Sequence, residues 1–478
     1  MKNFSIWKDG SFSINSCNLD SDIECDVLII GGGLTGISTL YHMKDSKFNC
    51  VLVEQNKIGM GVSANSTGKL TYLQDSMYNK IWKKYDKITA SKYLESQRDA
   101  INLVKNIIDD NDIECDLTKS KSYVYTDSDK EIDSLVELKD FLIDNNIDVK
   151  DDALDLVENK YVISVDDTYL FNPVKFIYEL VFKCNLDNYI YEGVSIVKID
   201  RDEEYYLCYT NLDRVIKCRY VVIASHYPYF NLPFLFPIKG SLEKSYLCSG
   251  HKDIENISLI SYNKPFVSIR NYRDYIIYLS NSCINSSHGN DKERFDELLG
   301  SAEYLKFIPS YSWSNIDIMT NDSLPYIGLI KENMFISTGY NTWGMTNGIF
   351  GGYIVSELLL GRSNKYSDLF DPKREISGNV LESVKNSYYS VEGIVNGFFK
   401  KNDSIEYKNI NGDSVCIYRD SEGEHIVYRK CPHMGCYLMF NEVEKTWDCP
   451  CHGSRFDING KCISGPANKD ISYKSDNY

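Results

Sequence analysis

The chain has 478 residues, enough for two or three domains, and its 43% hydrophobic and 25% charged residues are ordinary for a globular protein. Its net charge of −16 repels nucleic acid and anionic membranes, so neither is expected as a partner. The first residues do not resemble a signal peptide, and the longest late apolar stretch, 349–360, is too short to span a membrane, so we expect a cytoplasmic protein.

The first clear pattern is a strand, a glycine-rich turn, a helix and a second strand. Residues 26–30 form a short apolar run rich in β-branched residues, 34–43 is predicted to be a helix, and 51–54 to be the next strand. Glu54 ends this second strand, 23 residues after Gly31.

The turn carries the motif Gly31-x-Gly33-x-x-Gly36, with Leu34 and Thr35 inside it, and this context predicts a dinucleotide site. The glycines permit a tight turn and let a pyrophosphate approach the helix N-terminus, while Glu54 would bind ribose hydroxyls. The alternative is a glycine-rich turn that binds no ligand.

The next segments alternate between helix and strand patterns. A helix is predicted over 171–182 and a buried strand over 220–225, and aromatic, alternating segments between 235 and 320 indicate an antiparallel sheet. A strand at 335–338 and a helix from Thr346 to Leu360 follow. The polar stretch that comes next contains Pro372 and one predicted helix, from Val380 to Ser390, and after about residue 396 short strands and turns predict a small all-β domain.

The 15 cysteines divide into two groups. The ten before residue 430 are scattered without metal-ligand spacing, and we expect free, partly buried thiols. Later the chain has Cys431-x-His433 and Cys449-x-x-His452, with 15 residues between the pairs. Two thiolates and two imidazoles form the ligand set of a Rieske-type [2Fe–2S] cluster. A structural zinc site of Cys₂His₂ type is the alternative.

The segments CPHMGC (431–436), CPCHGSRF (449–456) and Gly465-Pro466-Ala467 resemble the three cluster loops of Rieske domains, and the resemblance covers about 80 residues. It implies that Cys436 and Cys451, the second cysteine of each ligand loop, form a disulfide, with two free buried thiols as the alternative. Ser454 is retained, but Phe456 stands where high-potential members have a tyrosine that donates a hydrogen bond to sulfur. The resemblance therefore implies a lowered potential and argues against a quinol-oxidising role.

Three segments of the larger part carry a second resemblance. They are IGMGVSANSTGKLTY after Glu54, SLPYIG (323–328) and ISTGYNTWGMTNG (336–348), and they resemble the glycine oxidase, sarcosine oxidase and D-amino-acid oxidase superfamily of FAD enzymes over about residues 20–370. Some members attach FAD through a histidine where this chain has Asn65, so the resemblance implies FAD bound non-covalently.

The resemblance also implies which residues contact the cofactor. In the superfamily, backbone N–H groups at a helix N-terminus face the flavin ring, a position that Gly344, Met345 and Thr346 match, with Trp343 beside the ring or, alternatively, in the core. Lys69 falls near a basic residue that relatives place over the flavin; a solvated surface lysine is the alternative. The other cofactor residues are Gln55, Ser66, Thr67, Ile196, Ser225 and Gly339.

The expected fold is an α/β FAD-binding Rossmann-like domain with an interleaved antiparallel-sheet substrate domain, plus a small all-β C-terminal Rieske domain. The oxidoreductase part spans 1–370, with FAD-binding segments at about 20–75, 150–228 and 320–370. Substrate-domain segments are expected at about 76–149 and 229–319, a linker at 371–395 and the Rieske domain at 396–478.

The combination implies a dehydrogenase. An amine or amino acid would deliver a hydride to FAD, and the electrons would pass singly to the cluster and on to an external acceptor protein. An electron-transfer reductase and a redox sensor remain as alternatives. The substrate itself cannot be read from the sequence: Arg270, Arg273, Tyr246 and Tyr275 could bind a carboxylate, with surface roles as the alternative.

Overall fold

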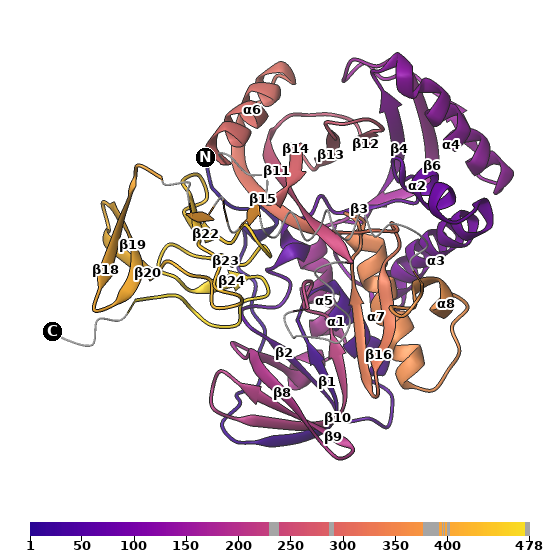
Figure 1. The fold of residues 1–478 in the computed structure, drawn as a ribbon. Coiled ribbons are helices and arrows are strands. Elements are labelled where there is room, and N and C mark those ends of the chain that lie inside the picture. Colours follow the sequence, from indigo (N-terminus) through magenta and orange to yellow (C-terminus); the bar gives the residue numbers. More distant parts are fainter. Residues whose placement is uncertain are drawn as a thin grey trace.

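The computed structural model describes residues 1–228, 239–285, 291–375, 392–393, 395, 397–398 and 402–473. The helix expected at 380–390 and most of the expected linker lie outside the described residues. Two large sheets with their helices form the main body, and the strands of the C-terminal unit, residues 402–473, lie to one side of it (Figure 1). In the described part of the chain, no helix is long and apolar enough to cross a membrane.

An eight-stranded sheet is built around the first strand of the glycine-rich unit. Its order is β16-β17-β10-β1-β2-β7, with parallel pairing from β17 to β7, while β16 is antiparallel and β9 and β8 continue from β10. The bounds are β1 Ile23–Ile30, β2 Cys50–Glu54, β7 Ile190–Glu192, β8 Ile196–Asp202, β9 Tyr205–Thr210, β10 Val215–Ile223, β16 Tyr326–Lys331 and β17 Met334–Thr338.

Both faces of this sheet are covered, which is why β1 and β2 are almost continuously apolar. Residues of α1 (Leu34–Met43), α5 (Pro173–Lys183) and α7 (Gly344–Leu359) join one face in the main core, and β8 and β9 contribute to a second core on the other. The helix α5 begins two residues later than predicted, because Pro173 is its first residue and the Asn172 side chain caps it.

A nine-stranded, mostly antiparallel sheet forms the second layer, in the order β15-β11-β14-β13-β12-β4-β6-β3, with β5 paired to β6. The bounds are β3 Lys69–Leu70, β4 Thr118–Thr126, β5 Val149–Asp151, β6 Tyr161–Leu170, β11 Gly240–His251, β12 Ile257–Ser261, β13 Ser268–Tyr272, β14 Tyr275–Ile284 and β15 Pro309–Thr320. β5 and β6 thus belong to this sheet, although the expected boundary at residue 150 had assigned them to the FAD-binding part.

The remaining helices of the main body pack around this second sheet and against α7 (Figure 1). They are α2 Met77–Lys84, α3 Lys87–Asn111, α4 Ile132–Asp144, α6 Asp291–Tyr304 and the short α8 Ser367–Phe370, with single 3₁₀ turns η1 Ile6–Lys8, η2 Val62–Asn65, η3 Asp129–Glu131 and η4 Leu186–Tyr189.

The C-terminal unit consists of two small antiparallel sheets that share one core. The first contains β18 Ile405–Ile410, β19 Asp413–Asp420 and β20 Gly423–Tyr428, and the second contains β21 Met439–Asn441, β22 Thr446–Asp448, β23 Arg455–Phe456 and β24 Cys462–Ser464. The two predicted ligand loops precede β21 and connect β22 to β23. The fold therefore brings both loops to one end of the unit, the end that touches the main body.

Candidate functional site

A single pocket begins at the turn between β1 and α1. Gly31 has a φ of +113°, and a Cβ atom there would lie 2.7 Å from the carbonyl oxygen of Ala224. A Cβ on Gly36 would lie 1.9 Å from the carbonyl oxygen of Gly31, so close packing of helix on strand requires glycine at both positions. Gly36 itself does not line the pocket. The residues of this turn that do are Gly31, Gly33, Leu34 and Thr35.

Glu54 lies beside this turn at the end of β2. Its carboxylate accepts hydrogen bonds from the backbone N–H of Gly32, at 2.8 Å, and of Asn56, at 2.9 Å. Burial raises the pKa of Glu54, although these two backbone donors oppose the shift. Glu54 therefore holds the turn in shape and also borders the pocket, where ribose hydroxyls are expected.

Three other predicted residues lie at or near this end of the pocket. Gln55 and Ser225 line it, but Ile196 does not: its side chain is fully buried in the second core. The pocket borders Val194 and Ser195 instead, which precede β8. The contact expected of Ile196 is made by its backbone rather than its side chain, and it stays a prediction.

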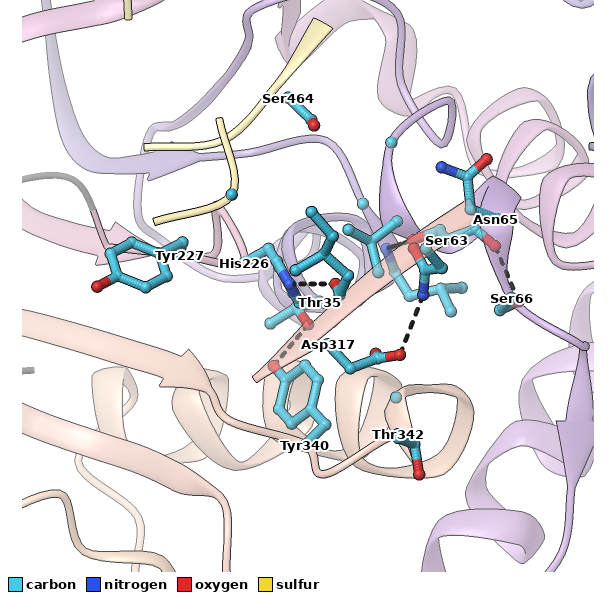
Figure 2. Close-up of a pocket in the computed structure, with 18 of the residues that line it drawn as sticks. Thr35, Ser63, Asn65, Ser66, His226, Tyr227, Asp317, Tyr340, Thr342 and Ser464 are labelled. Carbon is cyan, nitrogen blue, oxygen red and sulfur yellow. Dashed lines mark hydrogen bonds between the residues drawn. The ribbon is translucent and has the colours of Figure 1, made fainter. Parts of the chain in front are cut away.

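The loop after β2 is held by three donors from distant parts of the chain. The indole Nε1 of Trp7 donates to the Ser66 carbonyl at 2.7 Å, and that of Trp313 donates to the Asn65 carbonyl at 2.9 Å. Arg270 donates to the Thr67 carbonyl at 2.9 Å. The loop lines the pocket through Ser63, Asn65, Ser66 and Thr67, and Figure 2 shows Ser63, Asn65 and Ser66 together on one side.

Lys69 lines the pocket but is a buried residue rather than a solvated surface lysine. Its Nζ donates to the Leu259 carbonyl at 2.8 Å and to the Ser268 hydroxyl at 2.7 Å. Burial, and then the charge of Arg270, lowers the pKa of Lys69 well below its usual range. Both acceptors hold the amine in place at the edge of the pocket.

The late motif forms another part of the pocket wall and adjoins the loop. The helix α7 begins at Gly344, two residues earlier than predicted, directly after Trp343. Trp343, Gly344 and Met345 line the pocket, and the Ser66 hydroxyl contacts the Met345 sulfur at 3.4 Å. The N-terminus of α7, with its unpaired N–H groups and positive dipole end, therefore opens on the pocket as expected.

Two residues of this motif do not line the pocket. The Thr346 hydroxyl donates to Gln97 of α3 at 2.6 Å, inside a buried polar network that includes Asn347. Gly339, with a φ of +73°, makes the turn after β17, and a Cβ there would lie 2.6 Å from the Thr320 side chain. The Thr346 side chain and the Gly339 turn therefore contact protein groups behind the motif. The contact expected of Thr346 is made by its backbone N–H, so the assignment of both residues to the cofactor stays a prediction.

The pocket suits FAD in the nature of its groups. One end offers a helix N-terminus and Glu54, which match a pyrophosphate and a ribose, and another offers the N-terminus of α7, which matches the flavin ring. The indole Nε1 of Trp343 is buried and has no hydrogen-bond partner. Such an orphaned donor beside a pocket is the mark of a missing acceptor.

The pocket continues past the expected flavin position to the strands β11 and β15. Glu243 and Asp317 line it there, and the Asn315 amide donates to the Asp317 carboxylate at 3.2 Å. Figure 2 shows Asp317 and Tyr340 bordering the same pocket. Neither acid was predicted from the sequence. The alternating pattern between 235 and 320 indicates an antiparallel sheet but does not show that these two residues share a face.

The four residues suggested for a substrate carboxylate do not line this pocket. Arg270 is buried and donates to backbone carbonyls, Arg273 pairs with Asp116 on the surface, and Tyr246 donates to Asp291 at 2.6 Å. Tyr275 packs on His251, with ring centroids 4.0 Å apart.

The four predicted cluster ligands lie together in the C-terminal unit. The rings of His433 and His452 are 4.9 Å apart between centroids and nearly perpendicular, and the thiols of Cys431 and Cys449 contact each other. The Nδ1 atoms of both histidines are buried and have no hydrogen-bond partner. Two thiols and two orphaned imidazole nitrogens at one place are the donor set that a Rieske [2Fe–2S] cluster requires.

The residues around these ligands also follow the prediction. The Ser454 hydroxyl hydrogen-bonds to the Cys431 sulfur and accepts from the Ala467 N–H at 3.0 Å. A Cβ on Gly465 would lie 2.4 Å from the Ser454 Cα, so the third loop packs directly on the second ligand loop. Phe456 is fully buried in the core of the unit and brings no hydroxyl to the cluster.

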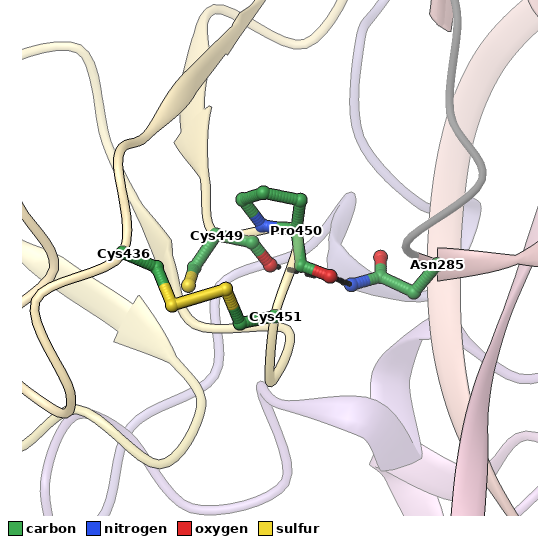
Figure 3. Close-up of a disulfide and its surroundings, with 5 residues drawn as sticks. All are labelled: Asn285, Cys436, Cys449, Pro450 and Cys451. Atoms are coloured by element: carbon green, nitrogen blue, oxygen red, sulfur yellow. Dashed lines mark hydrogen bonds between the residues drawn. A yellow bond between two sulfur atoms is a disulfide. The ribbon is translucent and has the colours of Figure 1, made fainter. Parts of the chain in front are cut away.

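The disulfide between Cys436 and Cys451 is present and joins the two ligand loops (Figure 3). The sulfur of Cys449 lies within 4.8 Å of both of its sulfurs. Asn285 of the main body donates to the carbonyls of Cys449 and Pro450, at 3.2 and 3.1 Å. The second ligand loop is therefore fixed from two sides, by the bridge and by the main body.

A buried ionic network fixes the C-terminal unit on β11. Lys244, with 1% of its side chain exposed, bonds Asp448 at 2.9 Å and Asp291 at 2.8 Å. Arg455 bonds the same Asp448 at 3.1 Å and Glu444 at 2.8 Å. Burial alone would raise the pKa of Asp448, but Arg455 and Lys244 hold this pKa well below its usual range.

The cluster loop reaches the same pocket as the flavin residues. His452, Gly453 and Arg455 line it, together with Ile463, Ser464 and Gly465. Gly453, with a φ of +74°, packs on the side chains of Leu242 and Ile316, and the His452 ring lies 5.9 Å from the ring of Tyr227. Figure 2 shows Ser464 and Tyr227 bordering the pocket that Thr35 and Tyr340 also enter.

Comparison with known proteins agrees with both halves of the site. The family model "FAD dependent oxidoreductase" (DAO) matches residues 26–358, well over half of the chain, and the model "Rieske [2Fe-2S] domain" matches residues 399–474. The Rieske 2Fe-2S iron-sulfur protein YhfW of Bacillus subtilis is 28% identical over 98% of this chain and 96% of its own.

Two further relatives match the main body. Gamma-glutamylputrescine oxidoreductase of Escherichia coli is 23% identical over 73% of this chain and 86% of its own. The crystal structure of glycine oxidase from Geobacillus kaustophilus superimposes with a TM-score of 0.62 at 17% identity, over 74% of this chain and all of that one. The chain therefore belongs to the DAO family of FAD-dependent oxidoreductases, and it carries a C-terminal Rieske [2Fe–2S] domain.

Proposed function

We propose that this protein is a dehydrogenase that oxidises an amine or an amino acid and passes the electrons through its cluster to an external acceptor protein. When bound, FAD accepts a hydride from the carbon beside nitrogen, and the [2Fe–2S] cluster carries one electron at a time. The observation that carries the proposal is the shared pocket: Trp343 and Met345 line it on the flavin side, and the cluster ligand His452 lines it on the other.

The residues of this chain divide the work between them. Gly31, Leu34 and Glu54 would hold the adenosine diphosphate part. The N–H groups at Gly344 and Met345 would favour negative charge on the flavin ring, since they stand at the positive end of α7. The disulfide and the contacts of Asn285 would keep the ligand loop beside the pocket.

The substrate class rests on the relatives and on the site together. The E. coli relative is named for γ-glutamylputrescine, an amine, and the superimposed protein is named for glycine, an amino acid. Beyond the flavin position, the pocket is lined by apolar side chains together with a few polar ones, the composition of a small-molecule site.

Anaerobic mixing of the purified protein with a panel of primary and secondary amines and amino acids tests the proposal. At least one compound should bleach the flavin absorbance within seconds, and the cluster should then become reduced. If no compound bleaches the flavin while a reduced electron-carrier protein reduces first the cluster and then the flavin, the protein is a reductase and the proposal fails.

A further inference from the structure

Two carboxylates face the pocket from neighbouring strands. The antiparallel register of β11 and β15 places Glu243 directly opposite Asp317, and both residues line the pocket. Like charges directly opposite each other destabilise a sheet. The two acids lie at the edge of a cavity, so a cation bound there would offset the repulsion between them.

The protein itself supplies little compensation. Asp317 accepts from the Asn315 amide and Glu243 from the Ser282 hydroxyl, and in the described part of the chain no lysine or arginine forms an ion pair with either acid. Burial and then the charge of Glu243 raise the pKa of Asp317 to about 7. Burial also raises the pKa of Glu243, although Lys264 and Lys80 oppose that shift.

The other charged groups that line the cavity also leave the two acids with little positive charge to balance them. Asp75 adds a third acid. Lys69 is held by two acceptors, and its pKa is well below its usual range. Arg455 is engaged by Asp448 and Glu444. Lys80 remains as a cation at the rim, over the Phe266 ring. Among the described residues, no arginine of the nine-stranded sheet lines the pocket, so this sheet offers no guanidinium group to bind a substrate carboxylate.

We infer that Glu243 and Asp317 bind the ammonium group of a cationic amine that has no carboxylate beside its nitrogen. The inference rests on the proposed function and narrows its substrate class from amines and amino acids to amines alone. Five apolar side chains line the same pocket and would accept the hydrocarbon part of the substrate: Met77, Leu247, Ile260, Phe266 and Leu279.

A pair of probes with nearly the same shape and opposite charge tests this. tert-Butylammonium carries the positive charge but has no hydrogen on the carbon beside nitrogen, so it cannot be oxidised, and pivalate carries the negative charge. Titration of the FAD-loaded protein, followed by the flavin absorbance and by calorimetry, should show binding of tert-butylammonium and none of pivalate. Equal binding of both, preference for pivalate, or binding of neither overturns the inference.

Variants connect the binding to the two acids. Glu243→Gln and Asp317→Asn should each raise the dissociation constant for tert-butylammonium about tenfold, since each removes a charged acceptor without changing its shape. The matched controls Glu255→Gln and Asp253→Asn, exposed acids outside the pocket, should leave it unchanged. Flavin content and circular dichroism establish that each variant is folded.

The outcomes separate the inference from the proposed function. If an amine reduces the flavin but both variants bind tert-butylammonium as the wild type does, the protein is an amine dehydrogenase and the carboxylate pair is not its binding site. If no amine reduces the flavin but probe binding depends on the pair, the cation site stands and the proposed function fails.

Discussion

The imidazole Nδ1 atoms of His433 and His452 are the groups whose role the structure defines most narrowly. They are buried side by side without hydrogen-bond partners, which is costly unless a metal occupies the position. Replacing His433 with alanine should lower the iron content from about two atoms per FAD to nearly none, with the flavin spectrum unchanged. His251→Ala, an exposed histidine, is the control. Iron retained in His433→Ala would contradict the ligand assignment.

Asp317 gives the pocket a pH dependence. Because its pKa is raised to about 7, its carboxyl group is largely neutral below that pH and charged above it. Glu243 on β11 and Asn315 on β15 act on it directly, and the other charged groups from neighbouring elements that line the same pocket are Asp75 just before α2, Lys80 on α2 and Lys69 on β3. The dissociation constant for tert-butylammonium should therefore fall as the pH rises from 6 to 8, and Asp317→Asn should flatten the profile. A wild-type profile that does not change with pH would contradict this.

The functional residues that could be predicted are those that lie close together in the sequence. His433 and His452 each lie within three residues of a ligand cysteine, so the sequence displays the site directly. Glu243 and Asp317 are 74 residues apart (317 − 243) and meet only through the register of β11 and β15. The hydrogen bond from the Thr346 hydroxyl to Gln97 on α3 was not predictable either, because the two residues are 249 positions apart in the sequence.

At the scale of elements, the disulfide joins two loops that the ligands also hold together. With the bridge present, the denatured and unreduced protein should show 13 reactive thiols once iron is removed, and 15 after reduction. Replacing Cys436 and Cys451 with serine should leave all four ligands able to bind the cluster but make its loss faster, because the loops separate more easily. A count of 15 before reduction would show that the bridge is absent.

The elements themselves were predicted where their pattern is local. The turn after β1 follows from glycine positions that act on their own segment. The helix α5 was predicted in the right place but two residues too early, although Asn172 and Pro173 mark its start. The membership of β5 and β6 in the nine-stranded sheet does not follow from their sequences, because short strands of similar composition fit either sheet. Pairing partners decide between them, and those are set by the tertiary fold.

At the scale of the whole molecule, Lys244 connects the main body to the C-terminal unit. Replacing it with methionine leaves Asp291 and Asp448 buried with less compensation, which costs about 3–5 kcal/mol when a buried pair is broken. The urea midpoint for loss of the cluster's visible circular dichroism should fall. Lys217→Met, at an exposed pair with Glu24, should leave it unchanged. Equal midpoints for both variants would show that the network does not hold the units together.

Two units were predictable from composition and motifs, but their contact was not. Lys244, Asn285 and Gly453 belong to segments that show no sign in the sequence of facing one another. The contact matters most for function, since it places the ligand His452 at the pocket that Trp343 and Met345 also line.

A single-turnover experiment tests the central claim, that the flavin pocket and the cluster form one electron-transfer unit within the chain. The protein is mixed anaerobically with one equivalent of an amine that reduces its flavin, and flavin absorbance and the electron paramagnetic resonance of the reduced cluster are followed in time. We predict that the cluster signal follows flavin bleaching at a rate independent of protein concentration. A cluster that stays oxidised, or a rate proportional to protein concentration, would contradict the account.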